Sequence, residues 1–144
     1  MLSVQTQKPA KFSESAAKVD RARAEELVQQ AYPGSHILFT RDDASGKLLG
    51  VSGDDFCGTI VVSAEGVCSR DLEMGEIFRN GILTMESALK ILALHRPEAD
   101  FYALELEEDD GSWEYEGEAL VDGEEYEFEL NACTGKLLEW ERDS

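Results

Sequence analysis

The sequence has 144 residues, 42% of them apolar and 31% charged, a composition typical of a globular protein of one ordinary or two small domains. Thirteen basic and thirty-one acidic residues give a formal net charge of −18. This shortage of lysine and arginine argues against nucleic-acid binding through phosphates and against binding to an anionic membrane surface. No apolar run approaches the roughly 20 residues of a membrane-spanning helix, so we expect no membrane insertion.

The negative charge is concentrated in the second half of the chain. Residues 1–81 hold 9 basic and 12 acidic residues, a net charge of −3. Residues 82–144 hold 4 basic and 19 acidic residues, a net charge of −15. A difference in charge of this size indicates two units with different functions.

The N-terminal residues MLSVQTQKPAKFSES do not resemble a signal peptide, because no apolar core follows a charged start. The sequence therefore leaves two alternatives open, a cytoplasmic protein or a mature piece from which a signal has been removed. Residues 1–12 are polar and contain Pro9, so we expect a mobile arm there.

The first unit is predicted to begin with a helix from about Ser13 to Tyr32. Apolar residues recur there at helical spacing, Ser13 or Ser15 can cap the helix, and Pro33-Gly34 ends it. Extended segments separated by turn residues follow. They are predicted at 36–41, 47–51 and 59–63, with a short fourth segment near 67–69.

The same pattern begins again in the second half. We expect residues 74–82 to form a linker or a short helical turn, with a break at Asn80-Gly81. Thr84 is a suitable N-cap for a helix over Met85–Arg96, which Pro97 ends. Four strands are predicted after it, at 101–107, 113–119, 124–130 and 137–141.

This succession indicates an internal repeat of about 64 residues. Pro33 and Pro97 are 64 residues apart, and Gly46 and Gly111 are 65 apart. Chance similarity between short apolar patterns is the alternative. The predicted fold class is α+β, with two repeated units, each one helix packed on an antiparallel meander of three to four strands. The predicted organisation is an arm at 1–12, a first unit at 13–72, a linker at 73–83 and a second unit at 84–144.

Apolar residues alternate with charged residues along the strands of the second unit, so they should share one sheet face. The helix over Met85–Arg96 should cover this face, because a bare aromatic sheet would aggregate. Trp113 and Trp140 are expected to be buried between helix and sheet. The remaining residues of this face are predicted to be Tyr102, Leu104, Leu106, Tyr115, Tyr126, Phe128, Leu130 and Leu138.

The glutamates between these residues should crowd the opposite face, where only Lys136 and Arg142 could relieve their charge. We expect their repulsion to raise some of the carboxyl pKa values. Three alternatives stay open for this face: a solvated surface, a docking surface for a basic partner, and divalent-cation binding. The loop Glu108–Gly111 lacks the ligand spacing of an EF-hand. The candidate docking residues are Glu105, Glu107, Glu114, Glu116, Glu125, Glu127 and Glu129, with Glu118, Glu139 and Glu141 on the same face.

Signals for catalysis, a cofactor or a metal are weak, and we predict none of the three. Of the two histidines, His95 should sit in the last helical turn and His36 should be exposed at a strand start. A zinc site would have to combine these histidines with Cys57 and Cys68, which no spacing suggests. The three cysteines, with Cys133, are interpreted as ordinary thiols. A Cys57–Cys68 disulfide is disfavoured because the intervening turn places Cys68 opposite Val61 or Val62.

The second half resembles a PepSY domain, a module of the propeptides of thermolysin-type peptidases and of many small bacterial proteins. The resemblance covers residues 82–143 and rests on the Ala-rich helix, the Asp-Asp-Gly turn, the EYEFEL strand and the ending Asn-Ala-x-Thr-Gly-Lys-x-Leu. Asn131 stands where the family usually has Asp. Residues 15–72 resemble a degenerate second copy, in which Ala64-Glu65-Gly66 replaces Ala132-Cys133-Thr134-Gly135.

The resemblance implies a noncatalytic module that binds or restrains a peptidase, found mostly outside the cytoplasm. The resulting hypothesis is a protein that inhibits or regulates a peptidase or another envelope protein by direct contact, with the peptidase or a basic protein surface as partner. The alternative is a scaffold whose two units pair within the chain or in a dimer, and a homo-oligomer is left open. A free acidic face favours the first hypothesis, and mutual burial of the sheets favours the second.

Overall fold

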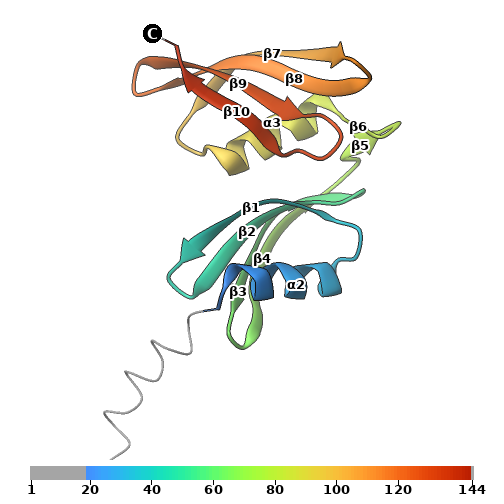
Figure 1. Cartoon of the computed structure of the whole chain (residues 1–144), viewed down its shortest axis with the longest axis vertical. Helices are drawn as coiled ribbons and strands as arrows, with labels where there is room; N and C mark the ends of the chain where they lie inside the picture. The colour runs from blue at the N-terminus through green and yellow to red at the C-terminus, as the bar shows by residue number, and fades with distance from the viewer. Residues whose placement is uncertain (1–18, 144) are drawn as a thin grey trace, which may run out of the picture.

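The computed structural model describes residues 19–143, in which two helices and ten strands form four stacked layers (Figure 1). The order of layers is α2, a first sheet, α3 and a second sheet. A two-stranded hairpin joins the sheets along the chain. The α+β class is therefore confirmed. The elements are α2 (Arg21–Ala31), β1 (His36–Asp43), β2 (Gly46–Ser52), β3 (Phe56–Ser63), β4 (Gly66–Met74), β5 (Phe78–Arg79), β6 (Ile82–Leu83), α3 (Met85–His95), β7 (Asp100–Asp109), β8 (Ser112–Val121), β9 (Glu124–Asn131) and β10 (Leu137–Arg142).

Both four-stranded sheets are antiparallel meanders. Their strands follow chain order, β1-β2-β3-β4 in the first sheet and β7-β8-β9-β10 in the second. A helix precedes each meander, α2 before the first and α3 before the second. Neither helix in the described part of the chain is long and apolar enough to cross a membrane.

The beginning of α2 differs from the sequence-based expectation. A single helix from Ser13 to Tyr32 is not observed, because Asp20 has an extended backbone and caps a helix that starts one residue later. Its carboxylate accepts a hydrogen bond from the Arg23 backbone N–H at 2.8 Å. Such a cap satisfies one of the free N–H groups of the first turn. Ser13, Ser15 and the predicted arm at 1–12 lie outside the described residues.

The predicted cap of α3 is confirmed, and the segment before it connects the two halves as a short hairpin. The Thr84 hydroxyl accepts a hydrogen bond from the Ser87 backbone N–H. Residues 74–82 were expected to be a linker or a short helical turn, and the connection contains the β5–β6 hairpin in place of a helical turn. Its two turn residues, Asn80 and Gly81, have φ values of 55° and 78°. An Asn-Gly pair in this left-handed conformation matches the twist of a tight hairpin.

The apolar residues form two cores, one on each face of the first sheet. In the outer core, Ala24 and Val28 of α2 pack against Leu49, Val51 and Ile60 of the first sheet.

In the inner core, α3 lies between the two sheets (Figure 1). Ile91 and Leu92 are fully buried there and pack with Leu38 of the first sheet and Phe128 of the second. A hydrogen bond also links the first sheet to the second half of the chain: the hydroxyl of Ser52 in β2 donates to the Thr134 carbonyl oxygen at 2.7 Å. The helix of the second half is thus buried on two sides.

Irregularities in the edge strands of the second sheet change which residues face α3. The register shifts between Phe101 and Ala103 in β7. As a result Phe101 packs against the core, while Tyr102 is 50% exposed. A second shift in β10, between Leu137 and Glu139, directs Leu137 toward the core and leaves Leu138 49% exposed. The sequence alternation alone therefore assigned Tyr102 and Leu138 to the wrong face.

The interior strands of the second sheet follow the predicted alternation more closely. Tyr115, Phe128 and Leu130 are buried as expected, but Leu106 is partly exposed. Trp113 and Trp140 are only half-buried at the margin of the inner core. Both tryptophans therefore pack against the core as predicted, but neither is buried to the extent expected.

Candidate functional site

Glutamates line up across the second sheet on the face opposite α3. Glu105 of β7 pairs with Glu116 of β8, Glu116 pairs with Glu129 of β9, and Glu129 pairs with Glu139 of β10. One row of four carboxylates therefore crosses the whole sheet, with neighbouring strands about 4.8 Å apart.

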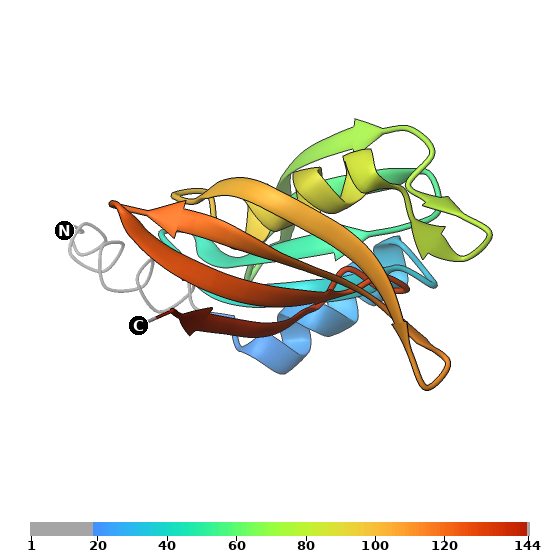
Figure 2. The same ribbon diagram turned by 90° about the horizontal axis from the view of Figure 1, so that it is seen from above.

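Two further rows lie beside the first. Glu118 pairs with Glu127 and Glu127 with Glu141, while Glu107 pairs with Glu114. Seen from above, no helix or strand covers these rows (Figure 2). We call the set the acidic face. Its members are Glu105, Glu107, Glu114, Glu116, Glu118, Glu125, Glu127, Glu129, Glu139 and Glu141.

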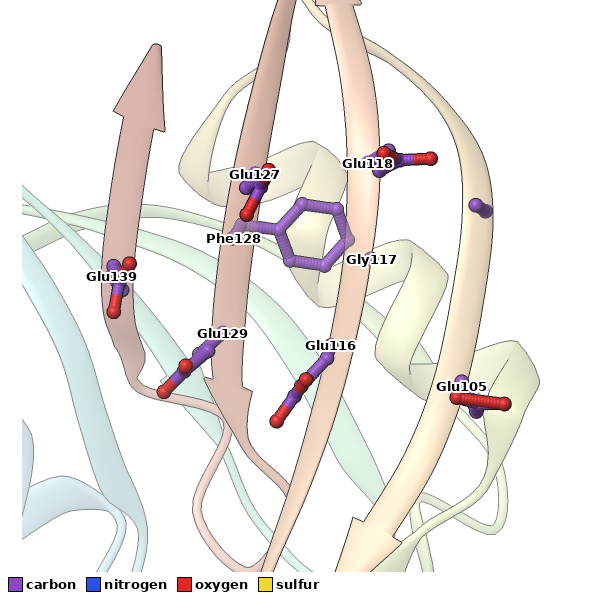
Figure 3. Close-up of a pocket in the computed structure, with 9 residues that line it drawn as sticks. Glu105, Glu116, Gly117, Glu118, Glu127, Phe128, Glu129 and Glu139 are labelled. Atoms are coloured by element: carbon purple, nitrogen blue, oxygen red, sulfur yellow. The ribbon is translucent and has the colours of Figure 1, made fainter. Parts of the chain in front are cut away.

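A shallow hollow of about 340 Å³ lies in the middle of the acidic face. Gly117 and Phe128 line it together with glutamates from all four strands (Figure 3). Gly117 is required there for packing, because a Cβ at this position would lie 2.0 Å from the Ala103 carbonyl oxygen and 2.6 Å from the Phe128 ring. The glutamates around the hollow are Glu105, Glu116, Glu118, Glu127, Glu129 and Glu139.

The charges of the acidic face are not neutralised by basic side chains. Within residues 19–143, none of the ten glutamates is in an ion pair within 4.0 Å. Arg142, one of the two bases expected to relieve them, pairs with Glu124 at 2.9 Å. The other, Lys136, is near Glu25 of α2, whose pKa is lowered mainly by a hydrogen bond from Thr40, with a small contribution from the charge of Lys136.

Three carboxyls of the acidic face have raised pKa values. The pKa of Glu107 rises mainly because its side chain shares a hydrogen bond with Glu105, and the charges of Glu116 and Glu105 add to this. Partial desolvation raises the pKa of Glu129, with contributions from neighbouring carboxylates. The charge of Glu141 is the main cause of the raised pKa of Glu139. These directions agree with the repulsion expected from the sequence.

Two groups of carboxylates are close enough together to hold a cation. The ligand atoms of Glu114, Glu116 and Glu129 lie within 4.8 Å of one another. The same holds for Glu118, Glu127 and Asp143. Exposed acidic groups of this kind are common without an ion, so the geometry alone does not establish a metal site.

The histidines and cysteines do not come together in the part of the chain that the structure describes. His95 is buried and its Nε2 lies 2.8 Å from the Gly135 carbonyl oxygen. His36, expected to be exposed, is half-buried with its ring edge on Phe78. Cys57 is buried, and it and the exposed Cys68 and Cys133 are free thiols. No zinc site is assembled from these residues.

The candidate docking residues lie on one face, but the set chosen from the sequence is incomplete. Glu118 and Glu139 border the hollow although they were outside the candidate docking set. Only the register of four strands shows that they complete the rows, and no local sequence signal distinguishes them. Tyr102, which is 50% exposed, lies at one end of the acidic face, where partial desolvation and the charges of Glu118 and Glu125 raise its pKa.

Comparisons with known proteins concern the second half most directly. Residues 82–141 match the family model described as "Peptidase propeptide and YPEB domain" (PepSY). No curated protein sequence matches the chain.

Two solved structures are similar to the chain over most of its length. A candidate lipoprotein from Clostridium difficile 630 is 16% identical, with a TM-score of 0.40, and the alignment covers 87% of this chain and 93% of that one. The C-terminal domain of YpeB from Bacillus megaterium is 12% identical, with a TM-score of 0.38, covering 88% of this chain and 66% of that one.

Proposed function

From the membership of residues 82–141 in the PepSY family of noncatalytic propeptide and regulatory domains, we propose that this chain is a binding protein that inhibits or regulates a peptidase or another envelope protein. The family also supports a location outside the cytoplasm. The proposal gives the chain no catalytic step of its own, and its effect on the partner arises from contact.

The observation that carries the proposal is the uncovered acidic face. Ten glutamates without a basic partner in the described residues form a dense negative surface on the second sheet. Like charges directly opposite each other on neighbouring strands destabilise the fold. A partner with a basic surface would relieve this repulsion on binding, and long-range attraction would speed the encounter.

Exposed Tyr102 at the end of the acidic face supports a protein partner over a simple cation. Interfaces are enriched in tyrosine, which combines apolar contact area with a polar group, and their polar rims supply specificity. We therefore place Tyr102 in the interface with the glutamates.

The first half of the chain is proposed to be a degenerate PepSY-like copy. The order of helix and four-stranded meander is the same in both halves, and this supports the proposal. In this arrangement the first unit supports the second, because it covers the side of α3 that the second sheet leaves free.

That packing also favours the alternative function of a scaffold. The inner core buries Leu38 of the first sheet with Ile91 of α3 and Phe128 of the second sheet, so the two units pair within one chain. A scaffold would need this pairing but would make no use of the acidic face. Removal of the glutamates should therefore weaken partner binding if the chain is a regulator, and should leave its function unchanged if the chain is a scaffold.

The test is a titration of the chain into secreted and envelope peptidases of its source, with hydrolysis of a fluorogenic peptide and the binding constant both measured. We expect at least one peptidase to bind with a Kd that increases with salt. The triple variant Glu105→Gln, Glu116→Gln, Glu129→Gln should weaken this binding by about tenfold or more.

A matched triple variant in the first half, Glu26→Gln, Asp43→Asn, Glu65→Gln, changes the net charge equally and should bind like the wild type. Equal loss in both variants would mean that net charge, and not the acidic face, causes binding. If no peptidase binds and both variants fold normally, the scaffold function is favoured.

A further inference from the structure

Two arginines from different layers approach each other beside the C-terminal end of α3. Arg41 lies in β1 of the first sheet, and Arg96 is the residue that caps α3 at its C-terminus. Burial lowers the pKa of Arg41, and the nearby charge of Arg96 lowers it further. Both side chains lie at the same helix end, because Arg41 hydrogen-bonds to the carbonyl group of His95, the residue that precedes Arg96.

Aromatic rings support both guanidinium groups. The Arg41 guanidinium carbon lies 4.1 Å from the centre of the Phe39 ring, and the Arg96 guanidinium carbon lies 5.0 Å from the centre of the Trp140 ring. Stacking of this kind fixes the plane of the guanidinium group and leaves its N–H edge available for hydrogen bonds.

The hydrogen bonds of these arginines are incomplete. Arg41 donates from Nη2 to the His95 carbonyl oxygen at the end of α3. The Nε of Arg96 is buried and has no hydrogen-bond partner among residues 19–143. A buried donor without an acceptor is costly, and it is rare in a folded protein.

The anionic partner that two arginines would require is also missing from the described residues. Neither arginine is in an ion pair within 4.0 Å there, although the chain carries a net charge of −18 and six other basic residues do pair. The charge of Glu98 offsets part of the lowering of the Arg41 pKa, but Glu98 forms no ion pair with any residue between 19 and 143. His95 beside them is buried, and this burial lowers its pKa.

We propose that Arg41 and Arg96 bind an oxyanion, the carboxylate or phosphate group of a small ligand or peptide end, at the junction between the first sheet and α3. A guanidinium fork recognises either group through two parallel N–H···O bonds. An oxyanion there would offer an acceptor for the Nε of Arg96 and would offset the repulsion between the two charges. It would also link the two layers, because one arginine comes from each.

The site is separate from the acidic face, which lies on the other side of the second sheet. Its test therefore does not depend on the proposed function. The probes are sodium phosphate and sodium acetate, each compared with sodium chloride at equal ionic strength and pH 7. Equal ionic strength keeps the screening of the acidic face constant.

We expect phosphate or acetate to raise the Tm above its value in chloride along a saturating curve. The same titration should shift the NMR signal of the Arg96 Nε–H group. Phosphate alone giving the effect would assign a phosphate group, and acetate alone would assign a carboxylate. The variants Arg41→Gln and Arg96→Gln should abolish both responses, while Arg70→Gln, a surface arginine over Tyr32, should keep them.

Arg96→Lys covers the case in which Arg96→Gln does not fold. It keeps the positive charge but lacks the planar fork, so the apparent affinity should fall by about tenfold or more. An unchanged Arg96 Nε–H signal in both titrations, or equal responses in Arg70→Gln and Arg96→Lys, would overturn the proposal.

Discussion

The two four-stranded sheets share a strand order but differ in how many of their faces are covered. The first sheet lies between α2 and α3, whereas α3 covers only one face of the second. The strands record this difference. Six of the eight residues of β3 are buried, whereas buried and more exposed positions alternate in the second half of β9. A strand covered on both faces needs apolar or small residues throughout, and one covered on a single face can place charges on every second residue.

The helices differ in the same way. Helix α2 contacts one sheet and exposes paired charges such as Arg23 and Glu26 to solvent. Helix α3 contacts both sheets, so Ile91 and Leu92 are fully buried. We therefore expect α3 to couple the unfolding of the two halves, and α2 to affect mainly the first sheet.

The largest expected effect is that of Ile91→Ala. This substitution leaves a cavity between the two sheets and should lower the free energy of unfolding by about 3–5 kcal/mol. Urea unfolding followed by circular dichroism and tryptophan fluorescence measures it. Because Ile91 contacts both halves, the two signals should shift together.

Val28→Ala is the matched substitution in α2. It removes fewer atoms from a core that involves one sheet, so the expected loss is smaller, about 2 kcal/mol. An equal loss of stability for the two substitutions, or separate transitions for the two signals in the Ile91→Ala variant, would contradict the coupling role of α3.

Trp140→Ala should have the next largest effect. Trp140 stacks on Tyr126 at 5.1 Å and lies beneath Arg96, but it is only half-buried. We expect a loss of about 2–3 kcal/mol, less than for a fully buried tryptophan. Chemical denaturation checks the value, with Trp140→Phe as a control that keeps ring stacking. A loss equal to that of Ile91→Ala would show that the margin of the second sheet is as enclosed as the inner core.

Tyr115→Phe tests a single hydrogen bond of the covered face. The Tyr115 hydroxyl donates to the Leu83 carbonyl oxygen of the β5–β6 hairpin at 2.7 Å, and both residues are buried. Removing the hydroxyl leaves that acceptor unpaired and should cost about 1–2 kcal/mol. Thermal and urea unfolding measure the loss. Tyr126→Phe, at a half-buried residue, is the control and should cost less.

The smallest effect, of opposite sign, is expected on the uncovered face. Glu129→Gln removes a carboxylate that has Glu116 and Glu139 as its direct neighbours. Because like charges oppose each other there, the variant should be slightly more stable, with a Tm a few degrees above that of the wild type at low salt. Added salt should raise the wild-type Tm more than that of the variant. Glu65→Gln, at an exposed turn, should have no such effect.

The pH dependence of stability contains two contributions of opposite sign. Raised pKa values at Glu107, Glu129 and Glu139 mean that the folded chain binds protons more readily than the unfolded chain, so stability rises as pH falls from neutral toward the ordinary value of 4.5. The lowered pKa of His95 acts in reverse, because stability is lost as pH falls from 6.5 through its folded value.

These two contributions can be separated by measuring the Tm of wild type and of Glu129→Gln side by side between pH 7 and pH 5. The gain on acidification should be smaller in the variant, while the contribution of His95 cancels in the difference. An identical pH profile for the two proteins would contradict the raised pKa at Glu129.

The sequence alone determined the local elements and the chemical character of the two faces of the second sheet. Alternation at a period of two separates Phe128 and Leu130 from Glu127 and Glu129 whatever the rest of the fold does. The Thr84 cap and the end of α3 before Pro97 are likewise set by neighbouring residues. The resemblance of the second half to PepSY domains rested on such local features.

Contacts between strands and between layers, in contrast, depend on the tertiary structure. The bulges that turn Tyr102 and Leu138 outward depend on the register with neighbouring strands, and the row of four glutamates needs all four strands in register. The place of α3 between two sheets brings Leu38 to Ile91, and the helix end brings Arg41 to Arg96; each pair is more than 50 positions apart in the chain. No local pattern encodes such contacts, because they follow from the packing of whole elements.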